Sequence, residues 1–194
     1  MGWLRGTPAK ARRQTIEEQV SDAIQQLAEL TAETVSHIVR SDNPIYEQGF
    51  PPSPGIDPDE RKIELIILEL YPLVRACLAS WGNSPGASEA AQHVLDLIHT
   101  RCFQVVSAAG LCDRDPAVFL KRTSERYKEY NALFDALAKS KEPKQASFRL
   151  AEAAAQHLGY GQDFIRITCC EIHILGSMNH YKEMFDGLKR DLAT

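Results

Sequence analysis

The densest cluster of side chains capable of chemistry lies near the C-terminus of this 194-residue chain. On a helix, Cys169, His173, His180 and Glu183 fall on one face, and Gly176 leaves space between the two histidines. His180 and Glu183 stand at positions i and i+3, a spacing at which a histidine and a carboxylate of a helical bundle bind one metal ion. This face is therefore a candidate ligand-binding site, although the sequence identifies neither a metal nor a cofactor for it.

The same face has a plain structural interpretation. His173 and His180 are about 10.5 Å apart along a helix axis, which is a long reach for one shared ion. A complete site needs ligands from a second helix, and no other segment supplies an E-x-x-H or H-x-x-x-H pair. A hydrogen-bonded core histidine at position 173, with His180 and Glu183 bordering solvent, is the favoured interpretation.

A second candidate is basic. Arg122, Arg126 and Lys128 alternate with two tyrosines, a combination that can contact phosphate or nucleic acid. However, Glu125 and Glu129 lie between these cations, which is typical of a salt-bridged helix face in solvent. The sequence therefore favours a solvated face over a phosphate or nucleic-acid site.

A third histidine, His99 in the stretch IHTRCFQ, is considered as a phosphate acceptor, but its spacing is not distinctive. The chain contains no nucleotide-binding G-x-x-x-x-G-K-[ST], no G-x-S-x-G and no H-E-x-x-H. Cys169 and Cys170 lie in an apolar run, where thiols stay neutral and inert. No motif assigns the chain to a family or to a reaction, so the sequence inclines against an enzyme.

The elements that must position these residues are helices. Apolar residues recur at three- and four-residue spacing throughout, and no period-two pattern competes with it. Asp57 and Asp115 stand where N-caps belong, each followed by a proline at the first helical position. The expected helices, about six in number, cover residues 15–40, 57–82, 87–109, 115–137, 143–158 and 163–192. The fold class is therefore an all-α, single-domain bundle.

The sequence also predicts how the last helix and the Pro-rich stretch pack in the bundle. Apolar residues between Phe164 and Leu175 fall on every side of the last helix, which predicts a largely buried C-terminal hub helix. The stretch 41–56 contains four prolines, so we expect no helix there. It is nevertheless too apolar for a disordered linker and should pack on its own bundle or on a partner. Residues 1–14 form a basic flexible arm, and residues 15–194 form the bundle domain.

The amino-acid composition disfavours some classes of function. The hydrophobic share of 44%, charged share of 25% and net charge of −4 are those of an ordinary globular protein and disfavour nucleic-acid binding by the whole molecule. No stretch reaches the roughly 20 apolar residues of a membrane span, so no membrane association is expected. Four of the five cysteines lie within helical apolar patterns, which favours a reduced, cytoplasmic protein.

The leading hypothesis is a non-catalytic helical protein-interaction module, either a homo-oligomer or a subunit of a complex. It depends on long amphipathic helices, an apolar Pro-rich stretch and the lack of catalytic motifs. The alternative is a metal- or small-ligand-binding bundle that uses the face of His173, His180 and Glu183, with or without enzymatic activity.

Overall fold

The computed structural model describes residues 16–81, 87–112, 115–139 and 143–192. Within these residues the chain forms seven helices and no strand, which confirms the all-α prediction. The helices are α1 (Ile16–Arg40), α2 (Pro44–Gly49), α3 (Pro58–Trp81), α4 (Ala87–Ala108), α5 (Pro116–Lys139), α6 (Pro143–His157) and α7 (Phe164–Leu192). The expected basic arm, residues 1–14, lies outside the described residues.

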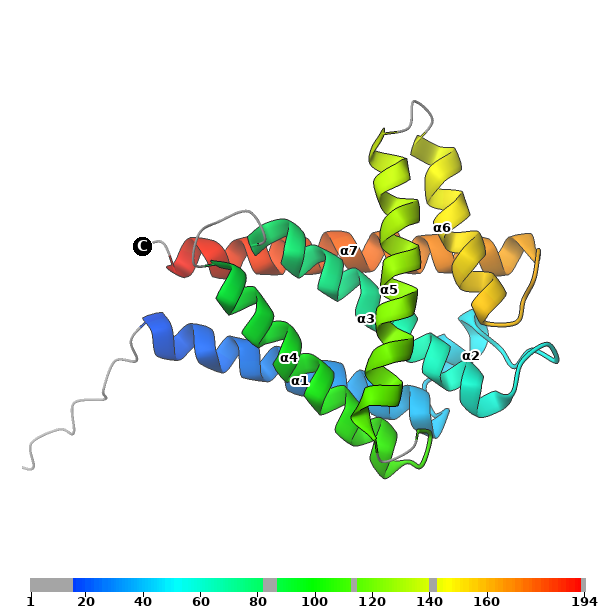
Figure 1. The fold of residues 1–194 in the computed structure, drawn as a ribbon, viewed down its shortest axis with the longest axis horizontal. Helices are drawn as coiled ribbons and strands as arrows, with labels where there is room; N and C mark the ends of the chain where they lie inside the picture. The colour runs from blue at the N-terminus through cyan, green and yellow to red at the C-terminus, as the bar shows by residue number, and fades with distance from the viewer. Residues whose placement is uncertain (1–15, 82–86, 113–114, 140–142, 193–194) are drawn as a thin grey trace, which may run out of the picture.

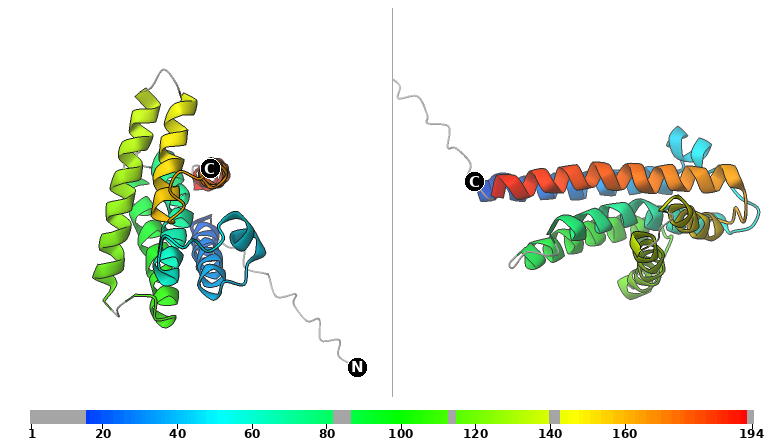
Figure 2. Two further views of the ribbon diagram at one scale, coloured as in Figure 1. Left: turned by 90° about the vertical axis from the view of Figure 1, so that its right-hand side faces the viewer. Right: turned by 90° about the horizontal axis from the view of Figure 1, so that it is seen from above.

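The long helices form two groups that cross each other (Figure 1). α7 and α1 run in opposite directions along the length of the molecule, and α3 packs mainly against α7 (Figure 1, Figure 2). α4 packs against α1, whereas α5 and α6 form a hairpin that runs across α3 and α7. No helix in the described ranges is both long enough and apolar enough to cross a membrane.

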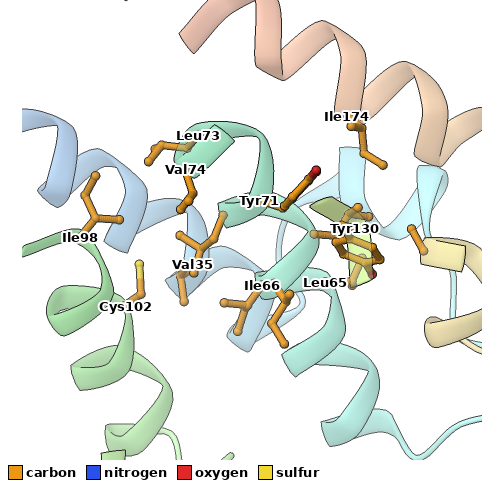
Figure 3. Close-up of a cluster of buried hydrophobic side chains, with 14 of the residues drawn as sticks. Val35, Leu65, Ile66, Tyr71, Leu73, Val74, Ile98, Cys102, Tyr130 and Ile174 are labelled. Atoms are coloured by element: carbon orange, nitrogen blue, oxygen red, sulfur yellow. The ribbon is translucent and has the colours of Figure 1, made fainter. Parts of the chain in front are cut away.

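The centre of the core is α3. Its side chains are buried on almost all sides between Ile63 and Cys77, and Trp81 at its end is only 2% exposed. Around it, Val35 of α1, Ile98 of α4 and Tyr130 of α5 enter one continuous apolar cluster (Figure 3). Because each fully buried Leu or Ile contributes about 1.5–3 kcal/mol, this helix accounts for much of the stability of the bundle.

α7 has the predicted contacts of a hub but not the predicted burial on every side. It contacts α3, α6 and α1, and it buries Ile174 and Phe185 completely. Phe164, Ile165 and Ile172, however, remain 67–68% exposed, so the prediction that its first half is covered on all sides is wrong. The helix lies along the outside of α3 and therefore keeps one apolar face uncovered.

The Pro-rich stretch 41–56 also differs from prediction, because it contains the short helix α2. Pro44 occupies the first position of α2, where its missing N–H is no loss. The stretch packs on its own bundle: the Ser53 hydroxyl donates to the Gly159 carbonyl at 2.7 Å, and the Tyr160 hydroxyl donates to the Pro51 carbonyl at 2.6 Å. These bonds fix it against the turn between α6 and α7.

Candidate functional site

The structure separates the four α7 residues that the sequence places on one face. His180 and Glu183 are exposed, and the His180 ring lies beside Tyr181 with their centroids 5.7 Å apart. Cys169 and His173 are partly buried, and His173 faces α3. In the part of the chain that the structure describes, no three His, Cys, Asp or Glu side chains form a group that could hold a metal ion.

His173 belongs instead to a buried polar cluster around Glu69 of α3. Its Nε2 atom lies 3.1 Å from a Glu69 carboxylate oxygen. The hydroxyl groups of Tyr46 and Tyr181 donate to the same carboxylate at 2.5 and 3.1 Å. Burial acts to raise the pKa of Glu69, but His173 and the two tyrosines outweigh it, so the pKa lies below its usual value. The cluster ties α2, α3 and α7 together around one carboxylate.

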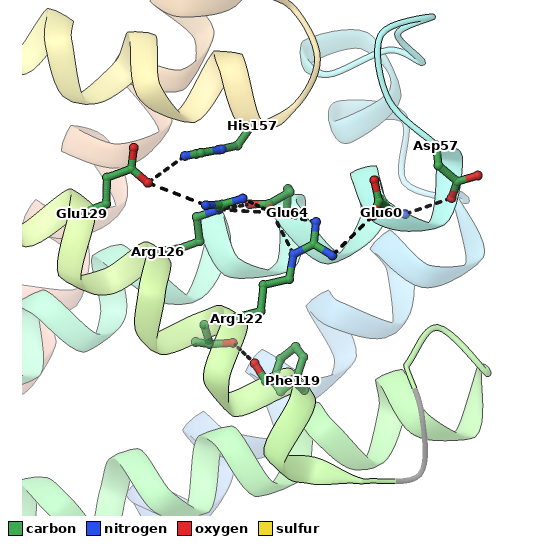
Figure 4. Close-up of polar contacts among 9 residues, drawn as sticks. Asp57, Glu60, Glu64, Phe119, Arg122, Arg126, Glu129 and His157 are labelled. Atoms are coloured by element: carbon green, nitrogen blue, oxygen red, sulfur yellow. Dashed lines mark hydrogen bonds and ion pairs between the residues drawn. The ribbon is translucent and has the colours of Figure 1, made fainter.

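The basic residues of α5 also have an internal partner (Figure 4). Arg122 donates from Nε to a carboxylate oxygen of Glu64 at 2.9 Å, and Arg126 donates to both oxygens of the same group at 3.0–3.2 Å. Glu64, on α3, is only 1% exposed. Lys128, the third residue of the basic candidate, is exposed on α5. Arg122 and Arg126 therefore neutralise a buried charge.

A separate site appears between α4 and α5, which we call the α4–α5 pocket. Its volume is about 750 Å³, and Val74 of α3 also lines it. Its apolar lining includes Leu95 and Phe103 of α4 and Leu120 of α5. The lining positions on each helix recur at three- and four-residue intervals, so each helix presents a single face to the pocket.

His99 and Tyr127 form the central polar pair of this pocket. Nδ1 of His99 lies 2.7 Å from the Leu95 carbonyl, and Nε2 lies 3.2 Å from the Tyr127 hydroxyl. Because a carbonyl only accepts, Nδ1 carries the proton, and Nε2 of the neutral ring accepts the hydrogen of the phenol. The pair thus links the two helices through one hydrogen bond with a defined direction.

Electrostatics keep this pair neutral. Burial lowers the pKa of His99, although the hydrogen bond to Leu95 and the charge of Asp96 act in the opposite direction. Burial likewise raises the pKa of Tyr127 well above its usual value. The lone pair of His99 is occupied and the phenol keeps its proton, so the pair suits recognition of a ligand better than acid–base catalysis.

Sequence reasoning singled out His99 but for a different chemistry, and it treated Tyr127 only as a residue of the basic helix. Asp96 and Thr123, which also line the pocket, carried no signal at all. These residues lie on two helices, and no spacing along the chain reveals which of their faces oppose each other. Leu95, His99 and Phe103 follow each other at steps of four residues, but that spacing is also the pattern of ordinary core packing.

The comparisons with known proteins add no assignment, because no protein-family model, curated protein or solved structure matches the chain. The functional conclusions therefore depend on the geometry described above.

Proposed function

We propose that this protein is a ligand-binding helical bundle, which holds a small, largely apolar molecule in the α4–α5 pocket. The observation that carries the proposal is the pocket itself. Its volume of about 750 Å³ lies in the range of small-molecule sites, and it combines apolar walls with a few converging polar groups. A neutral His99–Tyr127 pair supports this function, because an apolar ligand can cover it without burying a charge.

The binding test uses N-phenyl-1-naphthylamine, an uncharged dye whose fluorescence increases in an apolar site. We expect saturable binding with one dye per chain. Ser124 is exposed and lines the pocket, so Ser124→Trp places an indole over the opening and should weaken binding at least about tenfold, a loss of about 1.4 kcal/mol.

The matched control is Glu125→Trp, which puts the same side chain on the next exposed position of α5, outside the pocket lining. Its dye affinity should equal that of the unaltered protein. Non-saturating binding, or an equal loss in the Ser124 and Glu125 variants, would show that the dye does not occupy this pocket and would remove the proposal.

A specific observation also favours a second function, self-association through α7. Ile165, Cys169, Ile172 and Gly176 follow each other at alternating steps of four and three residues, the spacing of a helix-pairing seam. Ile165 and Ile172 are about two-thirds exposed, and a Cβ atom at Gly176 would meet nothing within 4 Å. Cys169 packs partly against the core, but the exposed positions Ile165, Ile172 and Gly176 are open to a second helix, and we propose α7 of another copy as its occupant.

Light scattering after size exclusion tests this second function. We expect a dimer for the unaltered chain and a monomer for Ile172→Glu, because the new charge would be buried in the seam. Leu30→Glu is the control, since Leu30 is also 62% exposed but lies on α1. A monomeric unaltered chain at high protein concentration would refute self-association and would leave the ligand-binding proposal intact.

A further inference from the structure

Two hydroxyl groups in the lining of the α4–α5 pocket, those of Tyr127 and Thr123, already give their hydrogens to partners within the protein. The Tyr127 hydroxyl gives its only hydrogen to Nε2 of His99. The Thr123 hydroxyl likewise gives its only hydrogen to the Phe119 carbonyl at 2.9 Å. Both residues line the pocket, and their hydroxyl oxygens keep lone pairs but have no hydrogen left to donate. These two groups can therefore only accept hydrogen bonds from a ligand.

Asp96 adds a negative charge to the lining, and an ionised carboxylate, like the two hydroxyl groups, can only accept hydrogen bonds. It lies at the exposed edge of the pocket, and Gln92 donates to one of its carboxylate oxygens at 2.7 Å. Gln92 also lines the pocket, so this hydrogen bond holds the carboxylate in the lining. Because His99 is neutral, Asp96 is the only charged group at neutral pH among the described residues that line the pocket.

From this arrangement we infer that the ligand is an organic cation: an apolar or aromatic body that carries a primary ammonium group. The body packs against Leu95, Phe103 and Leu120, while the ammonium group donates to the carboxylate of Asp96. A carboxylic acid of the same shape would bring a like charge close to Asp96. The inference rests on the proposed ligand-binding function and specifies its substrate class.

The test compares three probes with the same aromatic body: 2-(1-naphthyl)ethylamine, 2-(1-naphthyl)ethanol and 1-naphthylacetic acid. Each displaces N-phenyl-1-naphthylamine from the full-length protein, and the displacement curves give their affinities. We expect the amine to bind about fivefold more tightly than the alcohol, the size of a partly exposed ion pair, and the acid to bind most weakly. Added salt should reduce the preference for the amine and leave the alcohol unchanged.

Asp96→Asn tests the residue itself. The asparagine keeps the shape of the side chain and removes the charge, so the amine should lose its advantage while the affinity of the alcohol stays the same. Glu125→Gln is the matched control: it removes an exposed negative charge of α5 outside the lining and should leave the preference for the amine unchanged.

The outcomes separate the two proposals. If the dye binds in the pocket but the three probes bind equally, or if Asp96→Asn leaves the preference for the amine unchanged, the cation inference is overturned and the ligand-binding function stands. If the acid binds most tightly, Asp96 does not determine the charge of the ligand, and the cation inference is overturned as well. If neither the dye nor any probe binds, both proposals fail together.

Discussion

Replacing Glu64 with glutamine should destabilise the fold far more than the same change at its exposed neighbour Glu60. Glu64 is only 1% exposed, and its carboxylate accepts hydrogen bonds from Arg122 and Arg126 (Figure 4). Glutamine nearly preserves the shape but removes the negative charge, and its NH₂ group then faces guanidinium donors. The two arginines keep their positive charges without the anion that they surround.

The magnitude follows from the burial of the partners. Removing one member of a buried ion pair costs about 3–5 kcal/mol. The side chains of Arg122 and Arg126 are 30% and 24% exposed, so water relieves part of the loss, and we take the lower end, about 3 kcal/mol. For a chain of this length that corresponds to a decrease in Tm of about 6–12 °C. Glu60 lies 3.9 Å from Arg122 and is 57% exposed, so Glu60→Gln should cost at most about 1 kcal/mol.

Urea unfolding followed by far-UV circular dichroism measures both variants under one set of conditions. A third variant, which combines Glu64→Leu, Arg122→Met and Arg126→Met, should recover most of the lost free energy, because it removes all three charges together. The reasoning is refuted if Glu64→Gln costs no more than Glu60→Gln, or if the triple variant is the least stable of the three.

Three further predictions concern pH, thiol reactivity and backbone conformation. The neighbours of Glu69 hold its pKa below the usual value of 4.5, so the ionised carboxylate stabilises the fold at neutral pH. This contribution to stability is lost as the pH falls through the lowered pKa of the folded state. Urea titrations across that range should show a smaller acid loss of stability for Glu69→Gln than for the unaltered protein, and equal losses would contradict the prediction. Burial raises the pKa of Cys77 and Cys102 to about 12, so iodoacetamide at neutral pH should modify these thiols only after the protein unfolds. Mass spectrometry detects the modification, and rapid modification of the native protein would contradict this prediction. Gly159→Ala should cost at least about 2 kcal/mol in urea unfolding, because φ is +79° and the added Cβ would come within 2.8 Å of a side chain of the Pro-rich stretch. Gly110→Ala, with φ of +72° but open space, should cost only about 1 kcal/mol, and equal losses would mean that the close approach is unimportant.

The sequence predicted the helices well because their ends are determined locally. Asp57 accepts hydrogen bonds from the backbone N–H groups of Asp59 and Glu60, and Asp115 accepts one from Ala117, as the capping positions predict. These interactions span only two or three residues, so they can be recognised without knowledge of the fold. α2 escaped prediction because its proline was treated as a helix breaker, whereas at the first position of a helix it is well tolerated.

Burial was predicted less well, because it depends on neighbours far away in the chain. α7 contains enough apolar residues for burial on all sides, yet α3 takes the central position and leaves Ile165 and Ile172 exposed. A helix that is apolar on every face can be central or can carry an uncovered surface, and the helical wheel is the same in both cases. The arrangement of the other helices decides between them.

The sequence by itself therefore determined the all-α class, the approximate boundaries of the six longer helices and the residue types available for chemistry, since these depend on local periodicity and capping. Only the tertiary structure decided which of those residues meet. It placed His173 against Glu69 and Arg126 against Glu64, so that these charges stabilise the fold. It also brought His99 of α4 and Tyr127 of α5 together in one pocket. Contacts between helices depend on packing in three dimensions, and no periodicity along one helix records them.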